Sequence, residues 1–239
     1  MFLLHFAASL SIVIALPVII ETDKLNKWYK GAEDFHALID VSVQIEEGEF
    51  VSIVGQSGSG KSTLLYVLST LDTDYTGRIS VAGSDLKKLS KNQLAAFRNA
   101  SIGFVFQFHY LLPEFTVLEN VCLPALKLAK FDEDQIEEMA LQKLDILGLK
   151  SQALKKASML SGGQQQRVAI ARALINEPRI IFGDEPTGNL DSANSAMVFD
   201  IFKELSANHN QTIVIVTHDP DIADRTDRKI VMKDGKVAL

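Results

Sequence analysis

The feature that most constrains this chain is a glycine-rich loop that lies between two apolar segments. Residues 55–62 read GQSGSGKS, which fits the phosphate-binding pattern G-x-x-x-x-G-K-[ST]. The loop follows the β-branched and aromatic run Phe50–Val54 and precedes the apolar segment Thr63–Leu71, which we expect to be helical. A strand, a glycine loop and a helix in this order place backbone N–H groups and a helix N-terminus around a phosphate group. We therefore expect phosphate to bind here.

The residues of this loop have separate roles toward a chain of phosphates. Its glycines let backbone N–H groups turn inward, and the helix N-terminus adds a partial positive charge. Lys61 can reach β- and γ-phosphates, and Ser62 can hold Mg²⁺. The alternative is a glycine-rich turn with a chance lysine, which the flanking strand and helix disfavour. The predicted phosphate-binding residues are Gly55, Gln56, Ser57, Gly58, Ser59, Gly60, Lys61, Ser62 and Thr63.

Three apolar runs, each followed by a polar or glycine residue, indicate an α/β fold with a parallel sheet. The runs and the residues that follow them are Phe50–Val54 with Gly55, Ile180–Gly183 with Asp184 and Glu185, and Thr212–Thr217 with His218. Continuous apolar runs of this length are typical of strands buried on both faces, and helical segments separate them. Ligands bind outside the carboxyl ends of such strands. We therefore expect the residues that follow the runs to lie along one edge.

We predict a single domain over residues 18–239, with a helical lobe, roughly residues 108–159, inserted into the α/β core. Apolar residues at helical spacing predict helices at Leu118–Leu128 and Asp132–Leu149, and Gly148 is placed to end the second one. Near the N-terminus, Val41–Ile45 and Arg78–Val81 lie beside turn glycines and predict a small antiparallel β region.

The first 17 residues form an unusual apolar N-terminal extension. The run MFLLHFAASLSIVIALPVII has no charged residue, and a membrane-spanning helix needs about 20 apolar residues. No Lys or Arg precedes the run, which is atypical of a secretory signal. Val18–Ile20 also resemble the start of a first strand, which a span would consume. We favour a non-functional extension or an upstream translation start. A membrane anchor and a cleaved segment remain as alternatives.

Composition narrows the partners and cofactors that the chain can have. The formal net charge of −6 argues against a nucleic-acid partner, because such binding rests largely on Lys and Arg. Cys122 is the only cysteine of the chain, so an intrachain disulfide and a cysteine-based metal site are excluded. The five histidines show no metal-ligand spacing, and we predict no structural metal.

Two carboxylates and a histidine at strand ends point to phosphate chemistry. Asp184 can join the Mg²⁺ shell, and Glu185 can polarise a water toward a γ-phosphate. An Asp-Glu pair at a strand end is often only a helix cap or a solvated turn, and a lone histidine such as His218 is more often structural. The predicted phosphate loop on the same edge favours the functional interpretation of all three.

A second anion-binding motif stands at Leu160–Gln164, LSGGQ. Two glycines and a serine before a helical run expose backbone N–H groups, as in the first loop. Together the motifs resemble the nucleotide-binding subunit of ABC transporters, a likeness that covers residues 18–239 in the order and spacing of that family. The matching residues are Gly55–Ser62, Gln107, Leu160–Gln164, Asp184, Glu185, Asp191 and His218.

The resemblance implies a role for each matching residue and explains the two phosphate sites. Glu185 is expected to be the catalytic base, and His218 to contact the γ-phosphate. Gln107 is expected to sense Mg²⁺ and water, and Asp191 to touch the opposite subunit. Two chains are expected to face each other about a two-fold axis. The phosphate loop of one chain then holds ATP while Ser161, Gly162, Gly163 and Gln164 of its partner cover the γ-phosphate.

An aromatic side chain is expected to stack on the adenine base. The family has such a residue before the phosphate loop, where this chain has Trp28 and Tyr29. We choose Tyr29 by alignment, with Trp28 as a rival. The alternative is an aromatic pair that packs on a sheet edge.

The segment after Gln107 indicates the branch of the family. Phe104 and Phe106 alternate as expected of a buried strand, but the apolar residues that follow are too many for a solvated loop and predict a partner surface. These residues are Phe108, Tyr110, Leu111, Leu112 and Phe115. FQFHYLLPEFTVLENV is similar to the branch that holds the lipoprotein-releasing ATPases, the macrolide- and peptide-export ATPases and the cell-division ATPase.

Within that branch, the motifs are most similar to the lipoprotein-releasing type. The resemblance then implies a dimeric ATPase on the cytoplasmic face of a bacterial inner membrane, working with separately encoded transmembrane subunits. Macrolide or peptide export and a cell-division complex that signals without transport are the alternatives within the branch. A soluble ABC protein that acts on DNA or ribosomes is disfavoured, because the chain has one nucleotide-binding unit, no long heptad insert and an acidic balance.

Overall fold

A central sheet of mostly parallel strands organises the computed structural model, which describes residues 17–238. The strands lie in the order β11-β10-β4-β9-β8-β7, and every neighbouring pair is parallel except β10 with β11. Their bounds are β4 Phe50–Gly55, β7 Ile102–Phe106, β8 Ile180–Asp184, β9 Thr212–Val216, β10 Arg228–Lys233 and β11 Lys236–Ala238. The expectation for the apolar extension falls almost entirely on residues 1–16, which lie outside the described part of the chain.

The three apolar runs form neighbouring strands, as predicted. β4, β9 and β8 lie side by side, and all five residues of β9 are buried. Because parallel strands bring their carboxyl ends to one edge, the glycine loop after β4, Glu185 after β8 and His218 after β9 lie along the same edge. The backbone N–H of Glu185 donates to the carbonyl oxygen of Val216 at 3.0 Å, a distance typical of backbone hydrogen bonds.

The predicted antiparallel region forms a second sheet, of order β2-β1-β5-β6, with β3 paired to β1. Its strands are β1 Val18–Tyr29, β2 Phe35–Val41, β3 Gln44–Glu46, β5 Thr76–Val81 and β6 Ser84–Asp85. The expected strand at Val41–Ile45 is interrupted at residues 42–43. The Thr22 hydroxyl explains the break, because it donates to the Val41 carbonyl (3.1 Å) and accepts from the Val43 N–H (2.9 Å).

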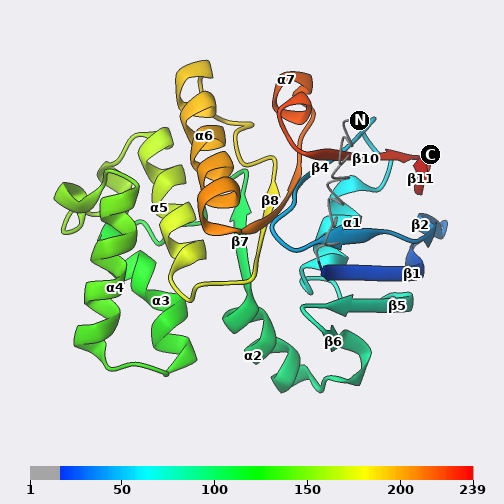
Figure 1. Ribbon diagram of the computed structural model, residues 1–239, viewed down its shortest axis with the longest axis horizontal. Coiled ribbons are helices and arrows are strands. Elements are labelled where there is room, and N and C mark those ends of the chain that lie inside the picture. Colours follow the sequence, from blue (N-terminus) through cyan, green and yellow to red (C-terminus); the bar gives the residue numbers. More distant parts are fainter. Residues whose placement is uncertain (1–16, 239) are drawn as a thin grey trace, which may run out of the picture.

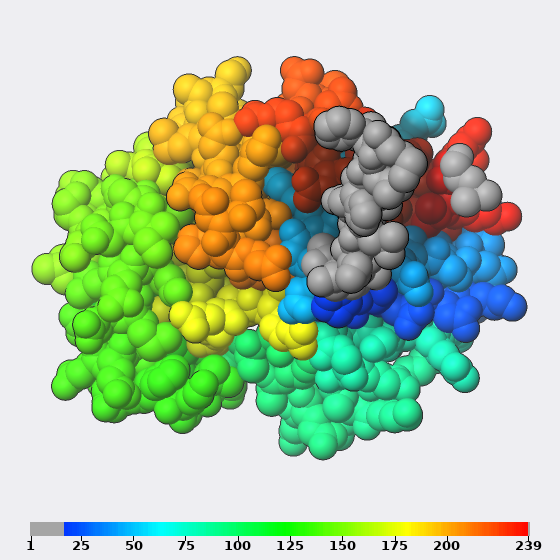
Figure 2. All heavy atoms as spheres, in the orientation of Figure 1, coloured from blue at the N-terminus to red at the C-terminus, as the bar shows by residue number. Residues whose placement is uncertain are grey.

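The helices of the core and of the lobe lie on different sides of the molecule (Figure 1). The core helices are α1 Lys61–Leu68, α2 Lys91–Ser101, α6 Ser192–His209 and α7 Pro220–Asp224, and the predicted lobe contains α3 Val117–Leu128 and α4 Glu133–Ile146. α5 Gly162–Leu174 begins just after the predicted end of the lobe, but it packs on α3 and α4, so we include it in the lobe. Short 3₁₀ helices cover Leu86–Lys88, Lys150–Gln152 and Ala157–Met159. In the space-filling view the lobe, coloured green, forms one end of the molecule (Figure 2).

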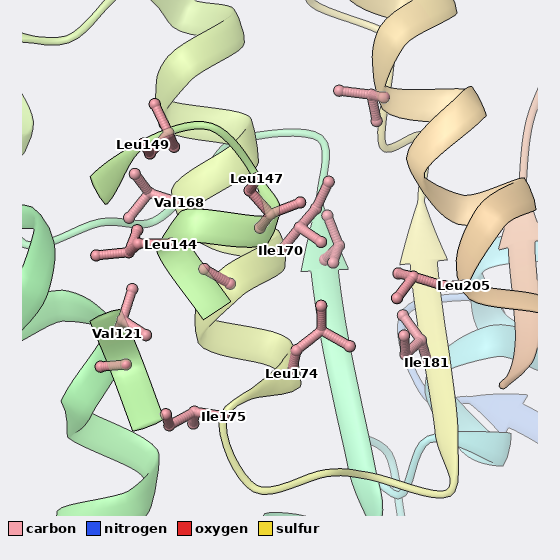
Figure 3. Close-up of a cluster of buried hydrophobic side chains, with 14 of the residues drawn as sticks. Val121, Leu144, Leu147, Leu149, Val168, Ile170, Leu174, Ile175, Ile181 and Leu205 are labelled. Carbon is pink, nitrogen blue, oxygen red and sulfur yellow. The ribbon is translucent and has the colours of Figure 1, made fainter. Parts of the chain in front are cut away.

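Capping boxes and apolar packing define the lobe. Thr116, Asp132 and Ser161 each begin a helix with a side-chain oxygen that accepts a backbone N–H three residues later, which stabilises a helix start by about 1 kcal/mol. α4 ends two residues before Gly148, whose φ of 68° is the left-handed conformation expected there. α5 packs on α3, α4 and β7 and thereby joins the lobe to the core (Figure 3).

Between residues 17 and 238 there is no helix with the length and apolar character that a bilayer crossing requires.

Candidate active site

The glycine loop between β4 and α1 has a backbone that other residues cannot adopt. Gly55 has a φ of 147°, and a Cβ there would lie 3.1 Å from the carbonyl carbon of Met232. Gly60 has a φ of 100°, and its Cβ would lie 2.5 Å from the Ala37 carbonyl oxygen. The loop therefore packs tightly against β2 and β10 and ends at Lys61, the first residue of α1. Its N–H groups and the positive end of α1 form a cradle for an anion.

Lys61 lies across this cradle. Its Nζ donates to the carbonyl oxygens of Gly55 at 2.9 Å and Gln56 at 2.8 Å. These two bonds hold the ammonium group over the loop instead of letting it extend into solvent. A phosphate bound in the cradle thus meets a positive charge that needs little rearrangement to contact it.

Asp184, at the end of β8, accepts hydrogen bonds from two hydroxyl groups of α1. Ser62 Oγ donates to Asp184 Oδ1 at 3.1 Å, and the Tyr66 hydroxyl donates to Oδ2 at 2.5 Å. Burial of Tyr66, followed by its hydrogen bond to Asp184, raises the pKa of the phenol well above its usual range, so the phenol stays a donor. Serine and aspartate oxygens are the ligands that Mg²⁺ prefers.

Glu185 and His218 form a hydrogen-bonded pair beside the loop. His218 Nδ1 lies 2.8 Å from Glu185 Oε2, and the side chains are 71% and 18% exposed. Glu185 has a φ of 47°, a left-handed conformation that is uncommon for a residue other than glycine. Such conformations cost about 1–3 kcal/mol and cluster at functional sites.

One cavity of about 420 Å³ brings most of the predicted phosphate-site residues together. Its lining residues are Phe35, Gly55, Ser57, Gly58, Gly60, Lys61, Ser62, Thr63, Glu185 and His218. Phe35 is 55% exposed and was not predicted from the sequence. It follows a turn at the start of β2 and pairs in register with Tyr29, but no motif marks it.

Gln107 follows β7 and does not line this cavity. Its side chain donates to Asn189 Oδ1 at 3.3 Å, and Asn189 Nδ2 donates to the Gln107 carbonyl at 3.2 Å. The buried Gln166 on α5 donates to the carbonyl oxygens of Phe106 and Pro186. The lobe helix α5 is therefore tied to both strand ends. Asn189 and Gln166 were not predicted, because their roles depend on packing between distant segments.

No residue of the LSGGQ motif lines the cavity. Ser161 caps α5, and the Ser161 N–H donates to Gln164 Oε1 at 3.0 Å. Ser161 and Gly162 are exposed, and Gly163 is buried. Asp191 likewise caps α6 and binds both the N–H and the side-chain amide of Asn194 at 2.8 Å. The N-terminus of α1 thus lies in the cavity, whereas the N-terminus of α5 is exposed outside it.

The two candidate aromatic platforms differ in their surroundings. The Trp28 ring stacks on His36 with a centroid distance of 3.8 Å and an interplanar angle of 13°. The Tyr29 hydroxyl lies 3.4 Å from Thr63 Oγ1, next to the phosphate loop. One face of Trp28 is thus occupied, whereas Tyr29 is already beside the loop, and this geometry favours Tyr29 as the adenine platform.

Comparison with known proteins indicates the family to which this chain belongs. The family described as ABC transporter matches residues 38–188. The lipoprotein-releasing system ATP-binding protein LolD of Aquifex aeolicus is 48% identical over 219 residues, which cover 92% of this chain and 96% of that protein. The LolD of Bacteroides fragilis is 48% identical over 208 residues, covering 87% of this chain and 96% of that protein.

Solved structures of related cassettes have the same fold. The dimeric structure of MJ0796, a bacterial ABC transporter cassette, superimposes with a TM-score of 0.84 at 42% identity and covers 92% of this chain and 97% of that chain. A post-hydrolysis state of MJ0796 bound to ADP and Pi gives the same TM-score of 0.84 at 41% identity, with 92% and 97% coverage. The fold predicted from the sequence is therefore confirmed, and the chain belongs to the ABC transporter family.

Proposed function

We propose that the chain is the ATP-binding and ATP-hydrolysing subunit of an ABC transporter that releases lipoproteins from the bacterial inner membrane. The cavity that unites Lys61, Ser62, Glu185 and His218 carries the ATPase assignment, because it combines an anion cradle with a carboxylate. The identity of 48% to two LolD proteins over most of each chain supports lipoprotein release. The subunit would then act at the cytoplasmic face of that membrane.

The phosphates of ATP would bind in the cradle of residues 55–63. Lys61 contributes the charge for the β- and γ-phosphates. Ser62 and Asp184, whose oxygens lie 3.1 Å apart, would hold Mg²⁺, with Gln107 closing the site. Mg²⁺ is commonly held by one or two protein ligands and substrate phosphates, which this small donor set fits. When bound, Mg²⁺ supplies neutralising charge on the phosphate oxygens.

Glu185 would act as the general base of hydrolysis. Its carboxylate accepts a proton from the water that attacks the γ-phosphorus, and the bond to the β-phosphate oxygen breaks. His218, within 2.8 Å of the same carboxylate, would orient Glu185 and then contact the γ-phosphate. Tyr29 would stack on the adenine base.

The position of the LSGGQ motif outside the cavity supports a site shared between two copies of the chain. Ser161, Gly162, Gly163 and Gln164 stand on the lobe, outside the cavity of their own chain. In a two-fold pair they would cover the γ-phosphate held by the partner, with Asp191 contacting that partner. Loss of the γ-phosphate would then loosen the pair, which couples hydrolysis to motion.

The segment after Gln107 would contact the transmembrane subunits. Phe108, Tyr110, Leu112 and Phe115 are 60%, 64%, 43% and 40% exposed, whereas Leu111, expected among them, packs against the core instead. The loop has a fixed backbone, because Arg172 donates to the carbonyls of His109 and Tyr110 at 2.8 and 2.7 Å. A rigid loop with outward aromatic groups is typical of a binding surface.

Reconstitution tests this function. The chain is co-purified in detergent with its transmembrane subunits and placed in proteoliposomes that contain a fluorescent bacterial lipoprotein. We expect MgATP to release the lipoprotein to the soluble fraction, and the Glu185→Gln variant to release none. ATP hydrolysis without release, together with export of a macrolide or a peptide, would contradict lipoprotein release and favour the exporter assignment.

A further inference from the structure

Tyr66 connects the phosphate-loop helix to the strand that carries Asp184. It lies four residues after Ser62 in α1, so both side chains lie on one face of the helix. They donate to different oxygens of the same carboxylate, Ser62 to Oδ1 and Tyr66 to Oδ2. Asp184 is therefore held at both oxygens by one helix, and its carboxylate plane is fixed relative to α1.

Packing of the aromatic ring explains why the Tyr66 hydroxyl stays in place. The ring lies 6.2 Å from that of Phe104 on β7, between centroids. Phe104 in turn packs on Phe106 at 4.2 Å and on Phe182 of β8 at 6.5 Å. The phenol thus rests on an aromatic row that spans the two strands beside Asp184, and the row restricts its rotation.

We propose that Tyr66 is a positioning residue that orients the Asp184 carboxylate for Mg²⁺ binding. With Oδ2 bound to the Tyr66 hydroxyl, Oδ1 stays directed toward Ser62, so the two oxygens proposed to hold the ion lie next to each other. The proposal rests on the proposed function, in which Ser62 and Asp184 hold the ion. Hydrogen bonds to the ligands of a metal commonly change its affinity by about 10- to 100-fold.

Nucleotide binding with and without Mg²⁺ tests the proposal. The full-length chain is titrated with a fluorescent N-methylanthraniloyl ATP analogue in EDTA, and the Mg²⁺ concentration for half-maximal enhancement of binding is then measured. We expect Tyr66→Phe to leave the affinity in EDTA unchanged and to raise the half-maximal Mg²⁺ concentration about tenfold. Tyr75→Phe is the matched control, because Tyr75 precedes β5 and lines a different cavity, and it should match the wild type.

Two further variants separate the outcomes. Ser62→Ala and Asp184→Asn should each raise the half-maximal Mg²⁺ concentration if these residues hold the ion. A normal Mg²⁺ response in Tyr66→Phe, with impaired responses in those two variants, would overturn the role of Tyr66 alone. A merely structural role would instead weaken binding in EDTA and lower the melting temperature without changing the Mg²⁺ response. Normal responses in all three would overturn the proposed metal site and, with it, the role of Tyr66.

Discussion

The side chain of Asn194 fills the space beside Gly163. A Cβ built at Gly163 would lie 2.5 Å from the amide carbon of Asn194 and 3.1 Å from its Cβ. The same amide group binds Asp191 at 2.8 Å. The start of α5, with its LSGGQ motif, thus packs directly on the start of α6. Packing against Asn194 within the chain therefore favours glycine at position 163, whether or not this residue also contacts a nucleotide.

Gly163→Ala should therefore destabilise the isolated chain. Overpacking of this kind typically costs about 1–3 kcal/mol, and the free energy of unfolding in urea measures it. Adding Asn194→Ala should recover part of the loss, because it removes the overlapping amide. Gly162→Ala is the matched control, since its Cβ would meet only Leu190 at 4.0 Å. Equal stability of the two alanine variants would contradict the packing relationship.

Glu185→Gln should bind ATP and hydrolyse it at least about 100-fold more slowly, because general-base catalysis contributes about that much. Pairs held together by unhydrolysed ATP should then accumulate and elute early in size-exclusion chromatography with MgATP. The control is Glu204→Gln, which changes an exposed glutamate on α6. A Glu185→Gln variant that stays monomeric and hydrolyses ATP at the wild-type rate would refute the role of Glu185.

Tyr29→Ala should weaken ATP binding more than Trp28→Ala. Stacking of a base on an aromatic side chain is worth about 1–3 kcal/mol, so the Kd should rise at least about fivefold. Trp28→Ala mainly removes the stack on His36 and should change the melting temperature more than the Kd. A larger Kd change for Trp28→Ala, measured by isothermal titration calorimetry, would assign the adenine platform to Trp28.

The apolar extension is tested by deleting residues 1–16 and keeping Pro17, whose carbonyl accepts the Glu47 N–H at 2.8 Å. ATPase activity and binding to the transmembrane subunits should persist if the segment is only an extension. Membrane fractionation without those subunits provides the readout. Loss of a carbonate-resistant membrane association on deletion would show that the segment is an anchor.

The sequence predicts the sheet edge well and the lobe packing poorly. Phe50–Val54, Ile180–Gly183 and Thr212–Thr217 are local patterns that depend on burial alone, and they form the neighbouring strands β4, β8 and β9. Asn194 meets Gly163 only because α5 and α6 pack side by side, and no local pattern encodes that contact.

Tyr66 lies between these two cases. Its spacing of four residues from Ser62 places both on one helix face, which sequence periodicity can indicate. Its partner Asp184 is separated from it by 118 residues. The hydrogen bond therefore becomes apparent only when β8 is placed beside α1. The sequence does predict the helix that carries Tyr66 and the strand that ends at Asp184.

In the proposed pair, each ATP site is shared between two copies of the chain. Gly162→Asp is the variant to use at the LSGGQ motif. Gly162 is exposed at the first position of α5, where an acidic side chain favours the helix but repels a phosphate. Lys61→Ala is the variant to use at the phosphate loop, because it removes the charge that holds the β- and γ-phosphates.

The most direct measurement is the ATPase rate of mixed pairs, isolated with two affinity tags and assembled with the transmembrane subunits. A pair of Lys61→Ala with Gly162→Asp retains one intact shared site, so it should match a pair of Lys61→Ala with wild type. A chain that carries both substitutions should abolish the activity of its wild-type partner. An inactive first pair, together with an active pair of the double variant and wild type, would contradict the shared site.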